Sequence, residues 1–307
     1  MTENNEYRFF PGCLIRARLP HVEKSARLVL NRLGVGLSEV EGASCCPNPV
    51  YFRDLDHEAW LMLAARNLAI AGKPMMTLCS GCYSTFREAE HALDESPMLR
   101  RKIGEHLDRL GLKLPSGSRA EHFARFLYEK VGPAKLEERV VRSLKGLKVV
   151  FHPGCHLVRP SRIHEFDDPD NPTKLEELVW ALGAEVLDYP RKMLCCGFTV
   201  MGVDRDLSLR MGFEKLKIMK ESGAQAVVLV CPSCMVQLDR NQRLIEQEFD
   251  TKLSLPVFYL TELIGLAFGE SSDSLGLGLH LVDVEPLVRE LLGLEEDRDV
   301  DVSPSRE

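Results

Sequence analysis

Ten cysteines divide this 307-residue chain into two similar halves. In each half a single cysteine is followed by an adjacent pair and then by a C-x-x-C. The first set is Cys13, Cys45, Cys46, Cys79 and Cys82, and the second set is Cys155, Cys195, Cys196, Cys231 and Cys234. The flanks repeat too, since Phe9-Phe-Pro-Gly-Cys13 matches Phe151-His-Pro-Gly-Cys155. Such a repeat indicates a duplicated structural unit.

Composition and charge favour metal or redox chemistry for these thiols. The chain is 45% apolar and 28% charged with a net charge of -7, which is typical of a globular protein and argues against nucleic-acid binding. The N-terminus lacks a signal-peptide pattern, and the apolar stretch at 59–71 is too short to span a bilayer. We therefore expect a cytoplasmic protein without a membrane span, where cysteines stay reduced and disulfides are rare.

Matching helices and strands are expected around the two cysteine sets. Apolar spacing predicts an amphipathic helix ending at Gly34 and a counterpart ending at Gly183, the latter with a Thr173/Glu176 capping box. A short strand should follow each of these helices and lead directly to the double cysteine. A second helix should come next in each half, followed by a strand that ends at the C-x-x-C. The expected ranges are strands 35–40, 184–189, 75–78 and 226–230, with helices 56–71 and 206–222.

This order predicts an α/β protein of two pseudo-symmetric domains. Each would be a small parallel sheet with flanking helices and with its cysteines at the carboxyl ends of the strands, where α/β folds form their ligand crevices. We expect a first domain with a helical extension at 1–147 and a second domain at 148–270. A C-terminal extension at 271–307 would contain one helix at 285–292 and an acidic tail.

Several metal sites are compatible with five convergent thiols. A structural zinc site uses four ligands, and adjacent cysteines in an extended segment point in opposite directions, so zinc fits the pattern poorly. A thioredoxin-type dithiol would leave three cysteines of each half unused. The C-x2-C-x2-C run of an ordinary ferredoxin cluster is missing. A cubane iron-sulfur cluster with a spare cysteine and an unusual cluster with a bridging thiolate both stay open.

The chain resembles the B-type subunit of heterodisulfide reductase, a family with paired cysteine-rich CCG domains. The resemblance extends over nearly the whole chain to about residue 290. Its segments are Pro11-Gly-Cys13, Glu41-Gly-Ala-Ser-Cys-Cys-Pro47, Cys79-Ser-Gly-Cys82, Pro153-Gly-Cys-His156, Cys195-Cys-Gly197, Cys231-Pro-Ser-Cys234, Pro256-Val-Phe-Tyr-Leu260 and Gly265-Leu-Ala-Phe-Gly269.

The resemblance implies a catalytic subunit that splits a heterodisulfide of the coenzyme M-coenzyme B type into two thiols. Each cysteine set would hold one four-iron, four-sulfur cluster of non-cubane type, and both clusters would face a shared cleft. Two clusters match a two-electron reaction, since iron-sulfur donors usually deliver one electron at a time. The resemblance also implies partners that supply electrons: a ferredoxin-like iron-sulfur subunit and a flavin-containing subunit.

Other residues refine this hypothesis or compete with it. The stretch 198–201 departs from the small, glycine-rich segment expected after Cys195-Cys-Gly197, which affects the pocket and the identity of the disulfide. His152 and His156 are candidate proton donors, and Arg16, Arg18, Arg159 and Arg162 are candidates to bind substrate anions. The competing functions are a CCG-type electron-transfer subunit of another oxidoreductase and a zinc-stapled assembly protein.

Overall fold

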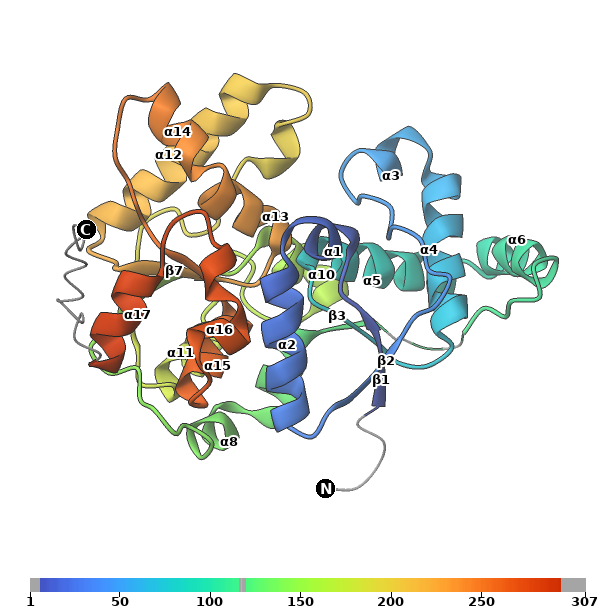
Figure 1. Cartoon of the computed structure of the whole chain (residues 1–307). Helices are drawn as coiled ribbons and strands as arrows, with labels where there is room; N and C mark the ends of the chain where they lie inside the picture. Colours follow the sequence, from blue (N-terminus) through green and yellow to red (C-terminus); the bar gives the residue numbers. More distant parts are fainter. Residues whose placement is uncertain (1–5, 116, 118–119, 294–307) are drawn as a thin grey trace, which may run out of the picture.

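Two four-stranded parallel sheets, one in each half of the chain, form the framework of the protein. The structure is a computed structural model that describes residues 6–115, 117 and 120–293. The strand orders are β2-β1-β3-β4 and β6-β5-β7-β8, and every neighbouring pair is parallel. Helices surround both sheets (Figure 1). The predicted α/β class with two pseudo-symmetric parallel sheets is confirmed.

The first half starts with β1 and ends with a short helix before the second sheet. Its elements are β1 (Glu6–Phe10), α1 (Cys13–Arg18), α2 (Pro20–Arg32), β2 (Gly36–Glu39), α3 (Phe52–Leu55), α4 (His57–Ala71), β3 (Met75–Thr77), α5 (Ser80–Glu95), α6 (Pro97–Asp108), β4 (Ala120–His122), α7 (Phe123–Phe126), the π-helix η1 (Leu127–Val131) and α8 (Pro133–Glu137).

The second half repeats this order and adds C-terminal helices. Its elements are β5 (Lys148–His152), α9 (Cys155–Val158), α10 (Ser161–His164), α11 (Lys174–Ala181), β6 (Glu185–Val186), η2 (Phe198–Val200), α12 (Arg205–Glu221), β7 (Ala226–Leu229), α13 (Pro232–Met235), the π-helix η3 (Val236–Arg240), α14 (Gln242–Glu248), β8 (Val257–Tyr259), α15 (Leu260–Ala267), α16 (Ser272–Leu275), η4 (Leu277–Leu279) and α17 (Glu285–Leu292).

The sequence explains why the central elements form where they do. Strand β7 is buried along its whole length, as expected for an inner parallel strand covered on both faces. Helix α4 begins where the Asp56 carboxylate accepts a hydrogen bond from Ala59 N at 2.9 Å, and it ends at Gly72, whose φ of 59° is left-handed. Helix α12 starts in the same way, because the Asp204 carboxylate accepts from Leu207 N at 2.9 Å.

Several expectations about single elements need correction. Each half has a fourth strand, β4 or β8, that the apolar pattern did not indicate. The double cysteines lie in loops well beyond the ends of β2 and β6, not directly at strand ends. The Thr173/Glu176 capping box is wrong, because the Glu176 carboxylate forms a buried ion pair with Lys192 at 2.7 Å instead. Helix 285–292 is confirmed, and the acidic tail lies outside the described residues.

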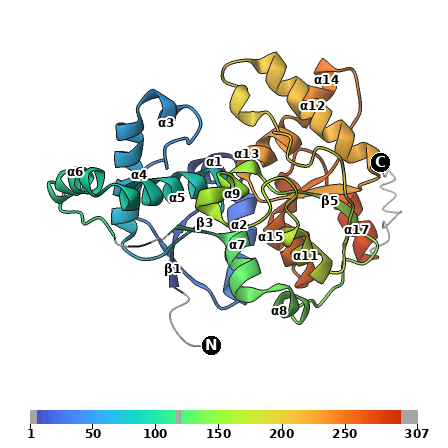
Figure 2. The ribbon, with the colours of Figure 1, turned by 180° about the vertical axis from the view of Figure 1, so that it is seen from behind.

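The two halves pack on each other in a reciprocal way. Helix α2 of the first half contacts α15 of the second, and α11 of the second half contacts η1 and α8 of the first. Likewise α1 packs on α13, and α5 packs on α9 (Figures 1 and 2). One large apolar core therefore contains residues from both halves, while a smaller core lies between the first sheet and α4. A domain boundary near residue 147 stays a proposal, since the halves share this core.

A buried polar network reinforces the contact between the halves. The imidazole of His280 lies between Glu262, at 3.2 Å, and Asp239, at 3.8 Å, and its ring centroid is 4.7 Å from that of His21 on α2. Burial lowers the pKa of His280, but the two carboxylates outweigh this effect and raise the pKa to about 10. His280 is therefore an imidazolium at neutral pH, and an imidazolium has no free lone pair for a metal ion.

We expect His280 to give the fold a pH-dependent stability. Between pH 6.5, the ordinary value, and about pH 10 the folded chain keeps a proton that the unfolded chain has released. The contribution of His280 is thus full below pH 6.5 and falls, by up to about 1.4 kcal/mol per pH unit, as the pH rises toward 10. Urea unfolding of wild type and His280→Gln from pH 6 to 9 measures the difference between their slopes.

The control for this experiment is His91→Gln, which removes a histidine that only pairs with Glu95 on the surface of α5. It should leave the slope of the wild-type profile unchanged. Parallel profiles for wild type and His280→Gln would show that the folded protein does not hold this proton.

Candidate functional site

All ten cysteines line one cavity of ≈ 240 Å³ between the two halves. All ten are free thiols. The same burial gradient occurs in both sets, because the single cysteine and the first member of the pair are the more exposed ones, and the second member and the C-x-x-C are buried. The fold thus brings all ten predicted cluster ligands to the same place, and their role as ligands stays a prediction.

The first set forms a continuous chain of sulfur contacts. Cys13 Sγ lies 3.8 Å from Cys45 Sγ, and side-chain hydrogen bonds link Cys45 to Cys46, Cys46 to Cys82, and Cys82 to Cys79. The adjacent pair lies in an irregular loop, so both of its side chains reach the cavity. The expectation that adjacent cysteines point in opposite directions is wrong here, because it assumed an extended strand.

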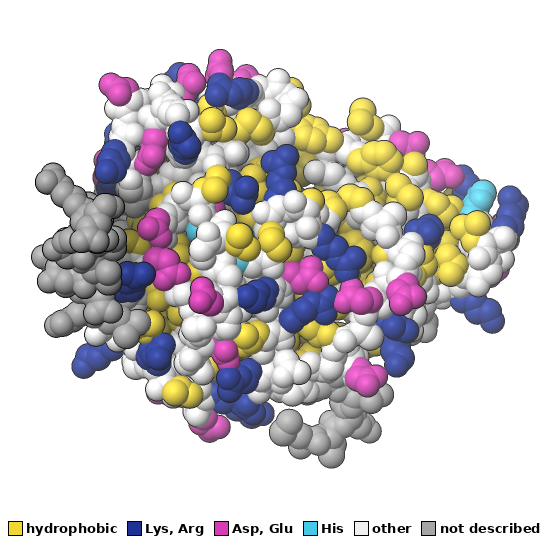
Figure 3. Space-filling view, in the orientation of Figure 1, with side chains coloured by type: hydrophobic (Ala, Val, Ile, Leu, Met, Phe, Trp, Pro, Cys, Tyr) yellow, Lys and Arg dark blue, Asp and Glu magenta, His cyan; other side chains and the backbone are white. Residues whose placement is uncertain are grey.

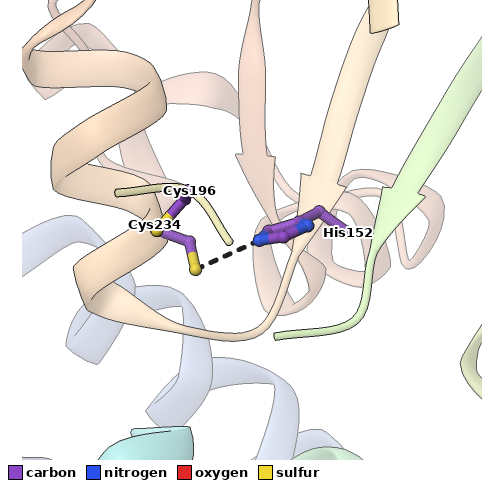
Figure 4. A group of neighbouring side chains, drawn as sticks. All are labelled: His152, Cys196 and Cys234. Carbon is purple, nitrogen blue, oxygen red and sulfur yellow. Dashed lines mark hydrogen bonds between the residues drawn. The ribbon is translucent and has the colours of Figure 1, made fainter. Parts of the chain in front are cut away.

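The second set repeats the links among the adjacent pair and the C-x-x-C, and it adds a histidine. Side-chain hydrogen bonds link Cys195 to Cys196, Cys196 to Cys234, and Cys234 to Cys231. His152, the last residue of β5, points at this group, with Nε2 3.2 Å from Cys234 Sγ (Figure 4). The ligand atoms of His152, Cys196 and Cys234 all lie within 4.8 Å of one another.

The two sets meet at equivalent residues. The Cys79 thiol donates a hydrogen bond to Cys231, which raises the pKa of Cys79, and these are the first cysteines of the two C-x-x-C motifs. A contact between equivalent residues places the pseudo-two-fold axis of the duplicated chain at this point. The thiols of both halves therefore form one group instead of two separate sites.

The glycines of the two Pro-Gly-Cys segments allow the backbone to pass close to the C-x-x-C cysteines. Gly12 and Gly154 have φ values of 100° and 73°, which side chains rarely adopt. A Cβ on Gly12 would come within 3.3 Å of Cys82 Sγ, and one on Gly154 within 3.3 Å of the Cβ of Cys231. Ser80 Oγ also donates to Val230 O at 3.1 Å, which ties the first C-x-x-C to the end of β7.

Buried polar side chains hold the loops that carry the double cysteines. Asn67, on α4, accepts a hydrogen bond from Ser44 N at 2.9 Å and donates to Cys45 O at 3.1 Å. Lys215, on the corresponding helix α12, donates to Lys192 O at 2.6 Å and to Arg191 O at 3.2 Å. Both side chains are fully buried, so each loop is fixed from the helix behind it.

The electrostatics of the thiols favour the binding of a soft metal centre. Hydrogen bonds from Cys45 and Cys82 lower the pKa of Cys46 to about 6, and hydrogen bonds from Cys195 and Cys234 hold the pKa of Cys196 well below its usual range. One member of each pair is thus poised as a thiolate. Thiolates are the ligands of iron-sulfur clusters, zinc and Cu(I). Five thiols of each set line the cavity, which exceeds the four ligands of a zinc site and fits a cluster of several irons.

Two loops from opposite halves form the rim of the cavity. Asn48, Pro49 and Val50 lie on one side, and Phe198 and Thr199 lie on the other. The Tyr51 hydroxyl donates a hydrogen bond to Thr199 O and so links the two loops. On the face shown in Figure 3, hydrophobic side chains gather between the α3 side and the α12–α14 side of the molecule. Phe198, which stands where a small, glycine-rich segment was expected, therefore helps to shape the cavity.

Of the candidate proton donors and anion-binding residues, only one histidine lines the cavity. His156 lines the cavity, whereas His152 is buried behind the cysteines, and burial lowers the pKa of His152. Among the described residues that line the cavity there is no arginine. Arg16 pairs with Glu39, and Arg159 pairs with Asp170 at 2.6 Å. These arginines form surface ion pairs, so the predicted role in binding substrate anions finds no support in this geometry.

The rim residues Asn48 to Val50, Ser233 and Gly81 were not identified from the sequence. Gly81 and Ser233 lie between the two cysteines of the C-x-x-C motifs, and this position was the available signal. The rim loop follows the first double cysteine, but its path across the cavity depends on the contact of Tyr51 with the other half.

We expect Asn67→Ala to destabilise the loop of the first double cysteine. The change removes the hydrogen bonds to Ser44 N and Cys45 O, and at about 0.5–1.5 kcal/mol for each bond the unfolding free energy should fall by about 1–3 kcal/mol. Asn241→Ala is the matched control, since this half-buried asparagine bonds only the Gln237 side chain and should lose less than about 1 kcal/mol. Urea unfolding measures both, and equal losses would show that Asn67 does not fix the loop.

Comparisons with known proteins agree with the fold and the cysteine pattern. A family model described as a cysteine-rich domain, CCG, matches twice, at residues 7–87 and 149–239. A crystal structure of a hypothetical protein from Helicobacter pylori superposes with a TM-score of 0.75 at 13% identity, covering 92% of this chain and 53% of that chain. This chain thus spans about half of that protein, and the likeness concerns the fold alone.

Several relatives have functional names. One is the B-type subunit of the ferredoxin:CoB-CoM heterodisulfide reductase of Methanosarcina mazei, 37% identical over 91% of this chain and 94% of the relative. Another is the 8-methylmenaquinol:fumarate reductase membrane anchor subunit of Wolinella succinogenes, 32% identical over 92% of this chain and 99% of the relative. Within the described part of this chain, no helix combines the length and apolar character needed to cross a membrane. The chain belongs to the family of B-type heterodisulfide reductase subunits, iron-sulfur oxidoreductase subunits built on two CCG domains.

Proposed function

We propose that this chain is the disulfide-splitting subunit of a cytoplasmic reductase complex. Its reaction takes a heterodisulfide, two electrons and two protons to two thiols. The substrate would be of the coenzyme M-coenzyme B type, in line with the name of the Methanosarcina mazei relative. The observation that carries the proposal is the single cavity lined by both cysteine sets.

The cavity suits a small disulfide better than a pure electron relay. A relay needs only that two redox centres lie close together, and the contact between Cys79 and Cys231 already provides this. The lining of the cavity also includes the apolar side chains of Leu14, Val50 and Phe198, which are not ligands of a cluster and which a relay does not need. A wall of this kind excludes water from a disulfide whose two sulfurs face the two sets.

The cofactors would be two four-iron, four-sulfur clusters of non-cubane type, one on each cysteine set. When bound, each cluster supplies one-electron redox chemistry next to the cavity. Cys13, Cys45, Cys46, Cys79 and Cys82 would hold the first, and Cys155, Cys195, Cys196, Cys231 and Cys234 the second. We assign to His156, which lines the cavity, a hydrogen bond to a departing thiolate.

Electrons must come from partner subunits. The sequence contains neither a nicotinamide fingerprint nor a ferredoxin-type cysteine run, so the proposed partners are a ferredoxin-like iron-sulfur subunit and a flavin-containing subunit. The second candidate function is an electron-transfer subunit of another oxidoreductase. The relative named as a fumarate reductase subunit favours it, since the name assigns that relative no disulfide chemistry.

Iron content tests the cofactor assignment. Anaerobically purified wild-type chain should contain ~8 Fe, and Cys46→Ser and Cys196→Ser should each contain ~4 Fe, because each removes a buried ligand from one set. Elemental analysis of all three proteins, with zinc measured alongside, gives the counts. Zinc in place of iron, or a single variant that keeps both the full iron content and full disulfide reduction, contradicts the two-cluster assignment.

Electron paramagnetic resonance separates the two candidate functions. If the cavity binds the products, added coenzyme M should change the cluster signals of the wild-type chain, and Phe198→Gly should weaken this effect by opening the rim. Leu207→Gly, at an exposed site on α12, is the control and should respond like wild type. Signals that stay the same with saturating thiol would favour the electron-transfer function.

A further inference from the structure

The two cysteine sets have different polar surroundings, although the chain is duplicated. Matching segments end β1 with Phe10 and β5 with His152. Phe10 packs edge-on against Phe86 at a centroid distance of 5.1 Å, whereas His152 places Nε2 3.2 Å from Cys234 Sγ (Figure 4). The second set therefore has a ring nitrogen within hydrogen-bond distance of Cys234 Sγ, where it donates its N-H whenever that sulfur is a thiolate, and the first set has an aromatic ring at the same point.

The helices behind the double cysteines also differ, and again the second half has the more polar side chain. Helix α4 presents the neutral side chain of Asn67 to its loop, and α12 presents the amine of Lys215. Lys215 is fully buried, and its amine donates hydrogen bonds to two backbone carbonyls. Burial lowers the pKa of Lys215 to about 8, and Cys234, Cys196, Cys195 and Cys155 oppose this effect, so the amine stays largely protonated at neutral pH.

Other cations near the two sets are neutralised by carboxylates. Arg16, beside the first set, is half exposed and pairs with Glu39 and Glu23. Lys192, beside the second set, is buried but pairs with Glu176 at 2.7 Å and with Asp188 at 3.3 Å. Among the described residues around both sets, Lys215 is the buried cation for which no ion pair with a carboxylate is found.

Hydrogen bonds and nearby positive charge both raise the reduction potential of a redox centre. A reduced cluster carries one more negative charge than the oxidised form, and N-H groups and cations stabilise that charge, most strongly where water is excluded. We propose that His152 and Lys215 are positioning residues that make the second set the site of higher reduction potential. This inference rests on the proposed function, in that each set must hold a cluster.

A redox titration of the full chain, followed by electron paramagnetic resonance, tests the inference. Wild type should show two transitions, and the transition that Cys196→Ser removes should be the one at higher potential. His152→Phe and Lys215→Asn copy the residues of the first half, and each should lower that potential only. We expect about a tenfold shift in the reduction equilibrium for Lys215→Asn, which is ~59 mV for one electron.

Two further variants control for charge and folding. Lys215→Arg keeps a buried cation and should retain most of the wild-type potential. Lys217→Met removes an exposed lysine from the same helix, and it should shift neither transition. If the wild-type transitions coincide, or if the variants move both transitions equally, the inference is overturned. An iron content of ~4 Fe in wild type would instead overturn the proposed function, so the two failures are distinguishable.

Discussion

The arrangement of the molecule depends on the contact between Cys79 and Cys231. These residues occupy equivalent positions of the two halves, so their contact fixes the pseudo-two-fold axis and brings both thiol groups to one cavity. Gly12 and Gly154 permit the close packing around these cysteines, because a Cβ on Gly12 would come within 3.3 Å of the Cβ of Cys79, and one on Gly154 within 3.3 Å of the Cβ of Cys231 and of Ser80 Oγ. Moving the halves apart would leave each set facing solvent, with no enclosed space between them.

The reciprocal helix packing maintains this contact. Helix α2 on α15, and α11 on η1 and α8, bury apolar side chains of both halves in one core. The Tyr259 hydroxyl bonds Leu78 O, and Ser80 Oγ bonds Val230 O, so the strand ends next to the cysteines are tied across the axis. The His280 imidazolium between Glu262 and Asp239 adds a charged buried link beside α2. The site is thus a property of the duplicated chain and not of either half.

Much of the fold could be predicted from the sequence, because it depends on local patterns. The helices ending at Gly72 and near Gly223 and the buried strand β7 follow from apolar spacing and turn residues within one half. The grouping of the ten cysteines follows from their repeated order. Strands β4 and β8 were missed, because three-residue strands carry too little periodicity. The paths of the double-cysteine loops, and the roles of Asn67 and Lys215, depend on hydrogen bonds between segments far apart in sequence, which spacing does not encode.

The proposed function requires two iron-sulfur clusters that face each other across one cavity. The most direct measurement is the magnetic interaction between them in a redox state in which both are paramagnetic. Since the two cysteine sets touch at Cys79 and Cys231, the wild-type spectrum should be broadened or split by dipolar coupling. Removing the second cluster with Cys196→Ser should leave one unsplit signal. A wild-type spectrum equal to the sum of two independent signals would contradict the account, because the clusters would then lie too far apart to share a substrate.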